Sequence, residues 1–179
     1  MVAVDATIVD FFYHFFYSPL IVGFFFVVLQ EIYEVQDCTK YDTTEYTTRQ
    51  DVQWAMPNGD FEIEADLMGT ATTNSYPQLY IGTVLNTNHI SIGQMTSNGN
   101  NYVGMELKKN NTRITLQQFN TKQSTNVYYN IKLTRIGNDY TIYWNNQTLT
   151  YTNSTVEPTY LFLIYLPSGK CKNIKIKAL

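Results

Sequence analysis

The stretch NGDFEIEADLMG, residues 58–69, alternates between acidic and apolar side chains. Successive side chains of a β-strand point to opposite faces, so as a strand this stretch has one apolar face and one acidic face. The acidic positions are Asp60, Glu62, Glu64 and Asp66, and the apolar positions are Phe61, Ile63, Ala65 and Leu67. The pattern predicts a strand that packs one face on a core and presents a row of carboxylates on the other.

Similar short segments follow one another from residue 31 to the end of the chain, separated by turn signals rich in Asn, Gly and Pro. No convincing amphipathic helix interrupts them. These features predict an all-β fold built as a two-sheet antiparallel sandwich. The predicted strands are 31–37, 51–56, 60–67, 78–85, 89–96, 102–108, 112–119, 127–136, 139–145, 147–152, 159–166 and 171–178.

Alternation within these strands also predicts which side chains fill the space between the two sheets. The segment YLFLIYL, residues 160–166, is apolar on both faces, which is typical of a central strand. The predicted core positions are Phe61, Ile63, Leu67, Leu79, Ile81, Val103, Met105, Leu107, Ile114, Leu116, Tyr129, Ile131, Leu133, Tyr140, Ile142 and Trp144.

Composition narrows the classes of function. A chain of 179 residues with 44% apolar content suits one domain with a single core. The net charge is −3, and the main basic cluster alternates along one strand-like segment, so a phosphate-binding surface for nucleic acid is not expected. Two histidines and two cysteines form no metal-ligand cluster and no Ser-His-Asp or Cys-His constellation, so we expect neither a metal nor a cofactor.

The first thirty residues differ from the rest. Residues 8–29, IVDFFYHFFYSPLIVGFFFVVL, are strongly apolar, and as a helix they would span ~33 Å at ~1.5 Å per residue, enough to cross a bilayer. Asp10, His14 and Pro19 argue against a membrane helix. The alternative is a hydrophobic arm that packs on its own domain or on a larger protein assembly. We therefore divide the chain into a hydrophobic N-terminal segment, 1–30, and a sandwich domain, 31–179.

A family resemblance rests on two runs in the second half of the chain. These are VYYNIKLTRIGNDYTIYWNNQTLTYT, residues 127–152, and YLFLIYLPSGKCKNIKIKAL, residues 160–179. They resemble the C-terminal half of concanavalin A-like lectin/glucanase (laminin G-like) jelly rolls, and the front half, with EIYEVQDCTKYD and GDFEIEADLMGT, is similar too. The resemblance covers residues 31–179 and implies a jelly-roll sandwich, a fold that identifies architecture better than activity. Domains of this type occur in viral tail fibres and prokaryotic surface proteins.

The resemblance also implies that the first and last strands lie side by side and antiparallel. In that arrangement Cys38 and Cys171 could face each other and form a disulfide, which would place the domain outside a reducing cytosol. The alternative is two unpaired thiols. The register would pair Tyr33 with Ile176, Glu34 with Lys175, Val35 with Ile174 and Gln36 with Asn173.

The carboxylate row has a catalytic and a non-catalytic interpretation. Glycoside hydrolases of this superfamily carry a strand motif in which two Glu residues flank an Asp, and Glu62, Glu64 and Asp66 have that spacing with Glu and Asp exchanged at the last two positions. Because the shorter Asp would withdraw the acid/base carboxyl, we do not expect an enzyme. The row then serves as a solvated strand face or as a polar surface for a ligand.

Outward-facing aromatic and amide side chains are the other candidates for ligand contact, because sugars are bound by rings against their apolar faces and by planar polar groups against their hydroxyls. A structural calcium would need Asp139 with Asn138, or Asp60 with Asn58. The candidate ligand-binding residues are Tyr80, Gln94, Gln117, Tyr128, Asn130, Tyr143 and Asn145, together with Glu62 and Glu64.

The sequence therefore predicts a non-catalytic jelly-roll module that binds a surface glycan or receptor, displayed on a virion or a cell surface. Residues 1–30 would attach it to a membrane or to a larger assembly, and copies of the module could pack together as a homo-oligomer. The alternatives are a purely structural component of a virion or surface, and a β-glucan hydrolase that uses the row Glu62, Glu64 and Asp66. An extracellular or virion-surface location follows from the first interpretation.

Overall fold

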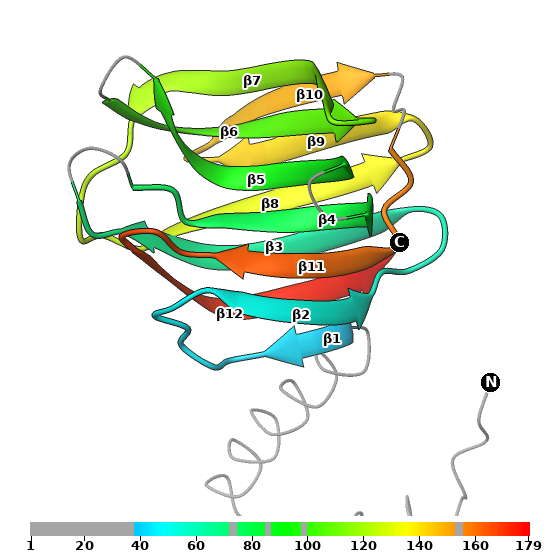
Figure 1. Ribbon diagram of the computed structural model, residues 1–179, viewed down its shortest axis with the longest axis horizontal. Helices are drawn as coiled ribbons and strands as arrows, with labels where there is room; N and C mark the ends of the chain where they lie inside the picture. The colour runs from blue at the N-terminus through cyan, green and yellow to red at the C-terminus, as the bar shows by residue number, and fades with distance from the viewer. Residues whose placement is uncertain (1–37, 72–74, 85–86, 98–99, 153–155) are drawn as a thin grey trace, which may run out of the picture. The chain divides into compact units, whose positions relative to one another are not determined.

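Two antiparallel sheets lie one behind the other in the computed structural model, which describes residues 38–71, 75–84, 87–97, 100–152 and 156–179 (Figure 1). Sheet A has the order β1 (Cys38–Asp42), β12 (Gly169–Ala178), β3 (Phe61–Gly69), β8 (Tyr129–Ile136), β9 (Asp139–Trp144), β10 (Gln147–Thr152). Sheet B has the order β2 (Gln50–Ala55), β11 (Tyr160–Tyr165), β4 (Gln78–Val84), β5 (Asn88–Ser97), β6 (Asn100–Lys109), β7 (Thr112–Lys122). The predicted all-β sandwich is confirmed.

The core lies between the two sheets and follows the alternation of the strands. Strand β3 buries every second residue, so Phe61, Ile63, Ala65 and Leu67 are shielded from solvent while the carboxylates between them are not. Burying side chains of this size contributes ~1.5–3 kcal/mol each, which makes this layer the main source of stability. The predicted core positions confirmed by burial are Phe61, Ile63, Leu67, Leu79, Ile81, Val103, Met105, Leu107, Tyr129, Ile131, Leu133, Tyr140, Ile142 and Trp144.

Two predicted core residues are wrong. Ile114 and Leu116 on β7 are 40% and 41% exposed. Lys108 of β6 pairs with Arg113, whereas the neighbouring Leu107 pairs with Thr115, so Ile114 is an extra residue in the ladder. Such a bulge shifts the alternation by one position and turns the following side chains to the opposite face.

The first strand is also displaced from its predicted place. Strands β1 and β12 are antiparallel neighbours, as the resemblance implied, but β1 begins at Cys38, and the predicted strand 31–37, with Tyr33, Glu34, Val35 and Gln36, lies outside the described residues. Other residues occupy the positions on β12 that were predicted to pair with this strand: Lys40 pairs with Ile176, Tyr41 with Lys175 and Asp42 with Ile174.

The predicted disulfide between Cys38 and Cys171 is therefore wrong. Cys38 lies opposite Lys177, six residues further along β12 than Cys171, a separation of ~20 Å at ~3.3 Å per residue. A disulfide needs Cα atoms within ~7 Å of each other. Cys171 is a buried free thiol whose backbone pairs with Tyr46 instead.

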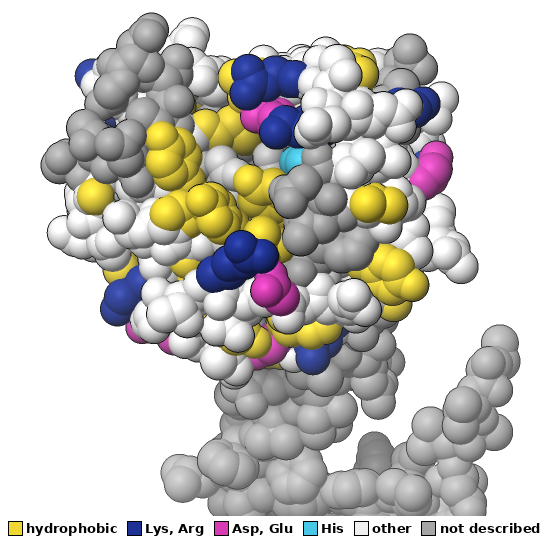
Figure 2. All heavy atoms as spheres, in the orientation of Figure 1, with side chains coloured by type: hydrophobic (Ala, Val, Ile, Leu, Met, Phe, Trp, Pro, Cys, Tyr) yellow, Lys and Arg dark blue, Asp and Glu magenta, His cyan; other side chains and the backbone are white. Residues whose placement is uncertain are grey.

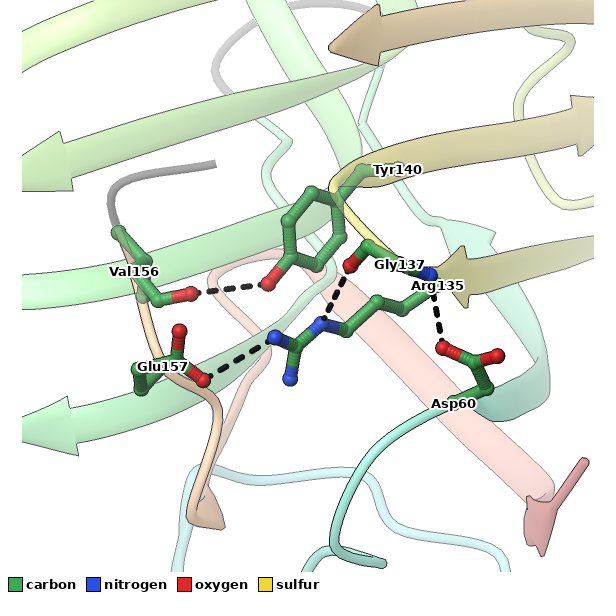
Figure 3. A network of polar contacts seen from close by, with 6 residues as sticks. All are labelled: Asp60, Arg135, Gly137, Tyr140, Val156 and Glu157. Atoms are coloured by element: carbon green, nitrogen blue, oxygen red, sulfur yellow. Dashed lines mark hydrogen bonds and ion pairs between the residues drawn. The ribbon is translucent and has the colours of Figure 1, made fainter. Parts of the chain in front are cut away.

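A network of polar contacts fixes one end of the sandwich (Figure 3). The backbone N–H of Gly137, in the turn between β8 and β9, donates to Asp60 at 2.7 Å, and Arg135 donates to the Gly137 carbonyl at 3.2 Å and to Glu157 at 3.1 Å. The buried Tyr140 hydroxyl donates to the carbonyl of Val156 at 2.9 Å. These contacts hold the β8–β9 turn, the start of β3 and the approach to β11 together, and they give Asp60 a structural partner.

The N-terminal hydrophobic segment lies outside the described residues, as does the predicted boundary between residues 30 and 31. Cys38–Leu179 forms one compact unit. Within the ranges that the structure describes, no helix is long and apolar enough to cross a membrane.

Candidate functional site

The carboxylate row lies on the outer face of sheet A, where each carboxylate has a polar partner. Glu62 pairs with Lys132 at 3.3 Å, and Glu64 accepts a hydrogen bond from the Asn130 amide at 2.8 Å. Asp66 accepts from Asn130 at 3.0 Å and from Asn173 at 2.7 Å. The row is thus a surface of cross-strand polar pairs, the kind of contact that stabilises neighbouring strands by ~0.2–1 kcal/mol each.

The outer face of sheet B has a different chemistry. Its strands β4, β5, β6 and β7 place residues opposite one another in three successive rows. These rows are Gly82, His89, Lys108 and Arg113; then Tyr80, Ser91, Glu106 and Leu116; then Gln78, Gly93, Gly104 and Gln118. In the second and third rows, small residues, namely Ser91 and the paired Gly93 and Gly104, lie beside larger side chains such as Tyr80 and Leu116. A face built in this way is hollowed along its centre.

A groove of about 290 Å³ follows this hollow, and we call it the sheet groove. Figure 2 shows this face: hydrophobic side chains gather across it beside a group of basic and acidic side chains. The groove joins aromatic rings, an amide, a carboxylate and a guanidinium on one surface. Its lining residues are Tyr76, Gln78, Tyr80, Met95, Glu106, Arg113, Leu116 and Tyr165.

One carboxylate and two cations form the charged part of the sheet groove and its rim. Glu106, whose side chain is only 14% exposed, pairs with Arg113 at 3.2 Å and with Lys108 at 3.2 Å. The two cations hold the carboxylate in place, and the hydrogen bond to Arg113 orients the guanidinium. The result is a fixed set of acceptors and donors that faces the groove, with charge-assisted hydrogen bonds roughly twice as strong as neutral ones.

Tyrosine rings form the aromatic part of the groove wall, and Tyr80 packs against two neighbouring rings. The centroid of Tyr80 lies 4.9 Å from that of His89 and 6.0 Å from that of Tyr165, which it meets edge to face. Burial raises the pKa of Tyr80 to about 12, with smaller contributions from Tyr165 and Glu106, so its hydroxyl keeps its proton at neutral pH. Tyr80 therefore combines an apolar ring with a hydrogen-bond donor.

His89 lies beneath this wall and is neutral at physiological pH. Burial lowers its pKa to about 4, and the nearby Lys108 acts in the same direction, whereas Glu106 opposes the shift. Its Nδ1 atom has no hydrogen-bond partner among the described residues. A buried neutral imidazole supports the Tyr80 ring by packing and adds no charge to the groove.

A second cavity, of about 520 Å³, lies where β7 ends and β8 begins, and we call it the end pocket. Three predicted ligand-binding residues line it, namely Tyr128, Asn130 and Asn145. The described residues that line it are Thr121, Lys122, Gln123, Ser124, Val127, Tyr128, Tyr129, Asn130, Trp144 and Asn145.

The predicted ligand-binding residues are thus divided among separate places. Tyr80 lies in the sheet groove, and Tyr143 lies on the outer face of sheet A, 37% exposed, with the Lys132 ammonium 4.9 Å from its ring centroid. Gln94 is 1% exposed, because it lies on the same face of β5 as the core residues Ile90 and Ile92 and pairs with the core residue Val103. Gln117 pairs with the core residue Met105 and is half-buried. Gln94 and Gln117 therefore do not form part of an open surface.

Sequence reasoning missed most of the sheet groove. Glu106 and Arg113 were not considered, and Leu116 was assigned to the core. The outward position of Tyr80 on β4 was recognised, and the same alternation on β5 and β6 places Ser91 and Glu106 beside it. What the sequence lacks is the order of the strands, which brings residues 80, 106 and 165 to one surface.

Within the described ranges, no group of three or more His, Cys, Asp or Glu side chains is arranged to hold a metal ion. Of the two pairs considered for calcium, Asp60 accepts the Gly137 N–H. Asp139 is exposed at the start of β9.

Comparison with solved structures finds β-sandwich proteins at low sequence identity. The carbohydrate binding module CBM66 from Bacillus subtilis gives a TM-score of 0.58 at 12% identity, over 78% of this chain and 91% of that chain. The complex of toad ovary galectin with N-acetylgalactose gives 0.53 at 11%, over 79% and 99%. Galectin LEC-6 of Caenorhabditis elegans gives 0.53 at 11%, over 76% and 94%. The chain has the concanavalin A-like jelly-roll fold of these lectin structures. No protein-family model matches the chain, and comparison with curated proteins gives no significant match.

Proposed function

We propose that this protein binds carbohydrate without chemical conversion and that the sheet groove is its binding site. The observation that carries the proposal is the juxtaposition, on one hollowed surface, of the Tyr80 and Tyr165 rings with the Glu106–Arg113 ion pair. Sugars present both an apolar face and a set of hydroxyl groups, so a site that recognises them needs both kinds of contact.

The groove supplies these contacts without rearrangement. An apolar sugar face packs against Tyr80 or Tyr165, and hydroxyl groups donate to the Glu106 carboxylate and accept from Arg113. The Gln78 amide, which also lines the groove, is held by donation from its Nε2 to the Gln94 carbonyl at 2.7 Å, so its carbonyl oxygen has a fixed direction. A preorganised site of this kind avoids the cost of ordering side chains on binding.

The distribution of carboxylates supports binding without catalysis. Retaining glycoside hydrolysis needs two carboxyl groups ~5–5.5 Å apart, and inverting hydrolysis needs two at ~6.5–9.5 Å. Among the described residues that line the sheet groove, Glu106 is the single carboxylate. The row Glu62, Glu64 and Asp66 lies on the other sheet, where Lys132, Asn130 and Asn173 occupy its oxygens.

Fold similarity supports the same class of function. The solved structures with this fold include one described as a carbohydrate binding module and a galectin in complex with N-acetylgalactose. At 11–12% identity they support the fold, and the proposal for this chain rests on the groove itself.

We further propose that the module is displayed at an extracellular or virion surface, attached through its N-terminal segment. The support is the sequence of residues 8–29, which is apolar enough either to enter a membrane or to pack against a larger assembly. Detergent-dependent solubility of the full chain distinguishes a membrane anchor from a packing arm.

A glycan array probed with the full chain tests the proposed function. We expect one class of glycan to bind, and the Glu106→Gln and Arg113→Ala variants to weaken that binding at least tenfold, because each removes a charge-assisted hydrogen bond worth ~1.5–3 kcal/mol. Tyr143→Ala is the matched control, since it removes an exposed tyrosine from sheet A. Binding that survives both groove variants, or the absence of any bound glycan, contradicts the proposal.

A further inference from the structure

We propose that the end pocket is a second carbohydrate site, which takes a neutral sugar unit independently of the sheet groove. The two cavities share no lining residue, and the end pocket lies between the end of β7, the start of β8 and the end of β9. The inference shares the ligand class of the proposed function, but it stands on a different surface and different residues.

The size of the end pocket suits one or two sugar rings. Its volume of about 520 Å³ falls within the ~300–1,000 Å³ that is typical of small-molecule sites. The loop of residues 123–127 contributes Gln123, Ser124 and Val127 to the lining, and the neighbouring strands β8 and β9 contribute Asn130 and Trp144. Asn145, in the turn that follows β9, completes this side of the pocket.

The loop wall is held in place before any ligand arrives. The Gln123 N–H donates to the Asn101 carbonyl at 3.1 Å, and the Asn126 N–H donates to the Gly69 carbonyl at 2.8 Å. The Gln123 side chain donates to the carbonyls of Ser124 at 3.3 Å and Val127 at 3.4 Å. These contacts tie both ends of the loop to the body of the domain, so binding does not require the loop to be ordered.

The aromatic side chains of the pocket are fixed as well. The Tyr128 hydroxyl donates to Glu45 at 2.8 Å, and the Lys172 ammonium lies 4.2 Å from the centroid of its ring. The ring centroid of Trp144 lies 5.2 Å from that of Phe119 and 6.5 Å from that of Tyr129. Trp144 and Tyr129 are 5% and 7% exposed, so they form the floor of the pocket, and the half-buried Tyr128 ring offers a sugar an apolar surface at little entropic cost.

The polar lining indicates a neutral, hydroxyl-rich ligand. Of the ten lining residues that the structure describes, only Lys122 is charged, and the other polar groups are hydroxyls, amides and the Trp144 indole N–H. Both NH bonds of Asn130 point to carboxylates, Glu64 and Asp66, which leaves its carbonyl oxygen to accept from a ligand hydroxyl. Sugar hydroxyls both donate and accept hydrogen bonds, and hydroxyl and amide side chains complement them in both roles.

Two sites on one domain have a consequence for affinity. A polysaccharide that reaches both sites binds the second one intramolecularly, and the combined affinity can exceed either single affinity by ~10²–10⁴. The protein would then bind long glycans much more tightly than the mono- or disaccharides that each cavity holds.

Indole resonances provide a direct test, because the chain contains two tryptophans and one of them, Trp144, lines the end pocket. The full chain, labelled with ¹⁵N, is titrated with lactose, cellobiose and chitobiose, and with glucuronic acid as the acidic comparison. We expect at least one neutral disaccharide to shift the Trp144 indole signal while the Trp54 signal stays in place. Trp54 lies on β2, away from the pocket lining, and serves as the internal control.

Variants assign the shift to the end pocket. Ser124→Phe places a ring at the exposed loop wall and should abolish the shift. Asn145→Gly keeps the positive φ of 49° at that position and should weaken binding roughly five- to tenfold through loss of the amide. Arg113→Ala, in the sheet groove, should leave the shift unchanged, so a failure of one site is distinguishable from a failure of the other. The proposal is overturned if no neutral sugar moves the Trp144 signal, if both pocket variants bind as well as the parent, or if glucuronic acid alone binds.

Discussion

The paired glycines Gly93 and Gly104, in the middle of sheet B, allow the sharpest prediction about stability. A Cβ atom at Gly93 would lie 2.2 Å from the backbone oxygen of Pro77, and the φ of this residue is +136°. An L-residue is strained by roughly 1–3 kcal/mol in such a conformation, and overpacking adds roughly 1–3 kcal/mol. Gly93→Ala should therefore lower the free energy of unfolding by roughly 2–6 kcal/mol, out of a typical total of ~5–15 kcal/mol.

Two further glycines separate the two causes. Gly137 has a φ of +57° with nothing within 4 Å of an added Cβ, so Gly137→Ala carries the conformational cost alone, about 1–2 kcal/mol. Gly104 has an ordinary φ, but its Cβ would lie 2.3 Å from the backbone oxygen of Gln117, so Gly104→Ala carries the steric cost alone. The predicted order of destabilisation has Gly93→Ala above both other variants.

Urea denaturation followed by tryptophan fluorescence measures the three changes. A variant that loses stability without a change in its unfolded state has a lower urea midpoint and the same m value, which is the dependence of the unfolding free energy on urea concentration. If Gly93→Ala were no more destabilising than Gly137→Ala, the close approach of Pro77 to β5 would be refuted.

Three other predictions concern buried groups. Tyr129→Phe removes a buried hydroxyl that has no partner in the described part of the chain, so the melting temperature should stay the same or rise; a clear decrease would show that the hydroxyl is bonded after all. Folding lowers the pKa of His89 from 6.5 to about 4, so the unfolded state binds more protons than the folded state between these pH values. The free energy of unfolding should therefore keep its full value above pH 6.5 and fall as the pH drops towards 4. In acid denaturation curves, the His89→Gln variant should lack this part of the pH dependence. In a Cys38→Ser background, Cys171 should react with a maleimide only after unfolding, because it is fully buried and burial raises its pKa; rapid labelling of the folded chain would contradict its position.

The alternation of side chains makes most of the sandwich predictable from sequence. Eleven of the twelve strands lie within a few residues of their predicted ranges, because each has one apolar face and ends at turn residues such as Gly137 or Asn145. The segment of residues 58–69 forms β3 as predicted, with its apolar side chains inside.

The failures arise where a strand departs from regular pairing or lies at an edge. Ile114 forms a bulge on the edge strand β7, and one extra residue is enough to move Leu116 from the predicted core to the surface. The register of β1 against β12 was inferred from four matched pairs of residue type, but the residues opposite Ile176, Lys175 and Ile174 lie seven positions further along the chain than predicted. This odd shift places Lys40 opposite Ile176 and Asp42 opposite Ile174, so the pairing at this edge does not follow matched residue types. Pattern alone could not predict this register.

The sheet groove could not be predicted for a related reason. Its residues come from β4, β6, β7 and β11 and from the segment before β4, and they lie between positions 76 and 165. Alternation indicates that Tyr80 and Glu106 point outward, but only the strand order brings them together. The carboxylate row drew attention because its residues are close in sequence, and the structure places it on the outer face of sheet A, where its carboxylates contact lysine and amide side chains.

A crystal structure of the full chain with the glycan selected on the array tests the central claim most directly. We predict a sugar ring in the sheet groove, packed on Tyr80 or Tyr165, with hydroxyl groups within hydrogen-bond distance of Glu106 and Arg113. A glycan bound along the outer face of sheet A, at Glu62, Glu64 and Tyr143, would contradict the claim.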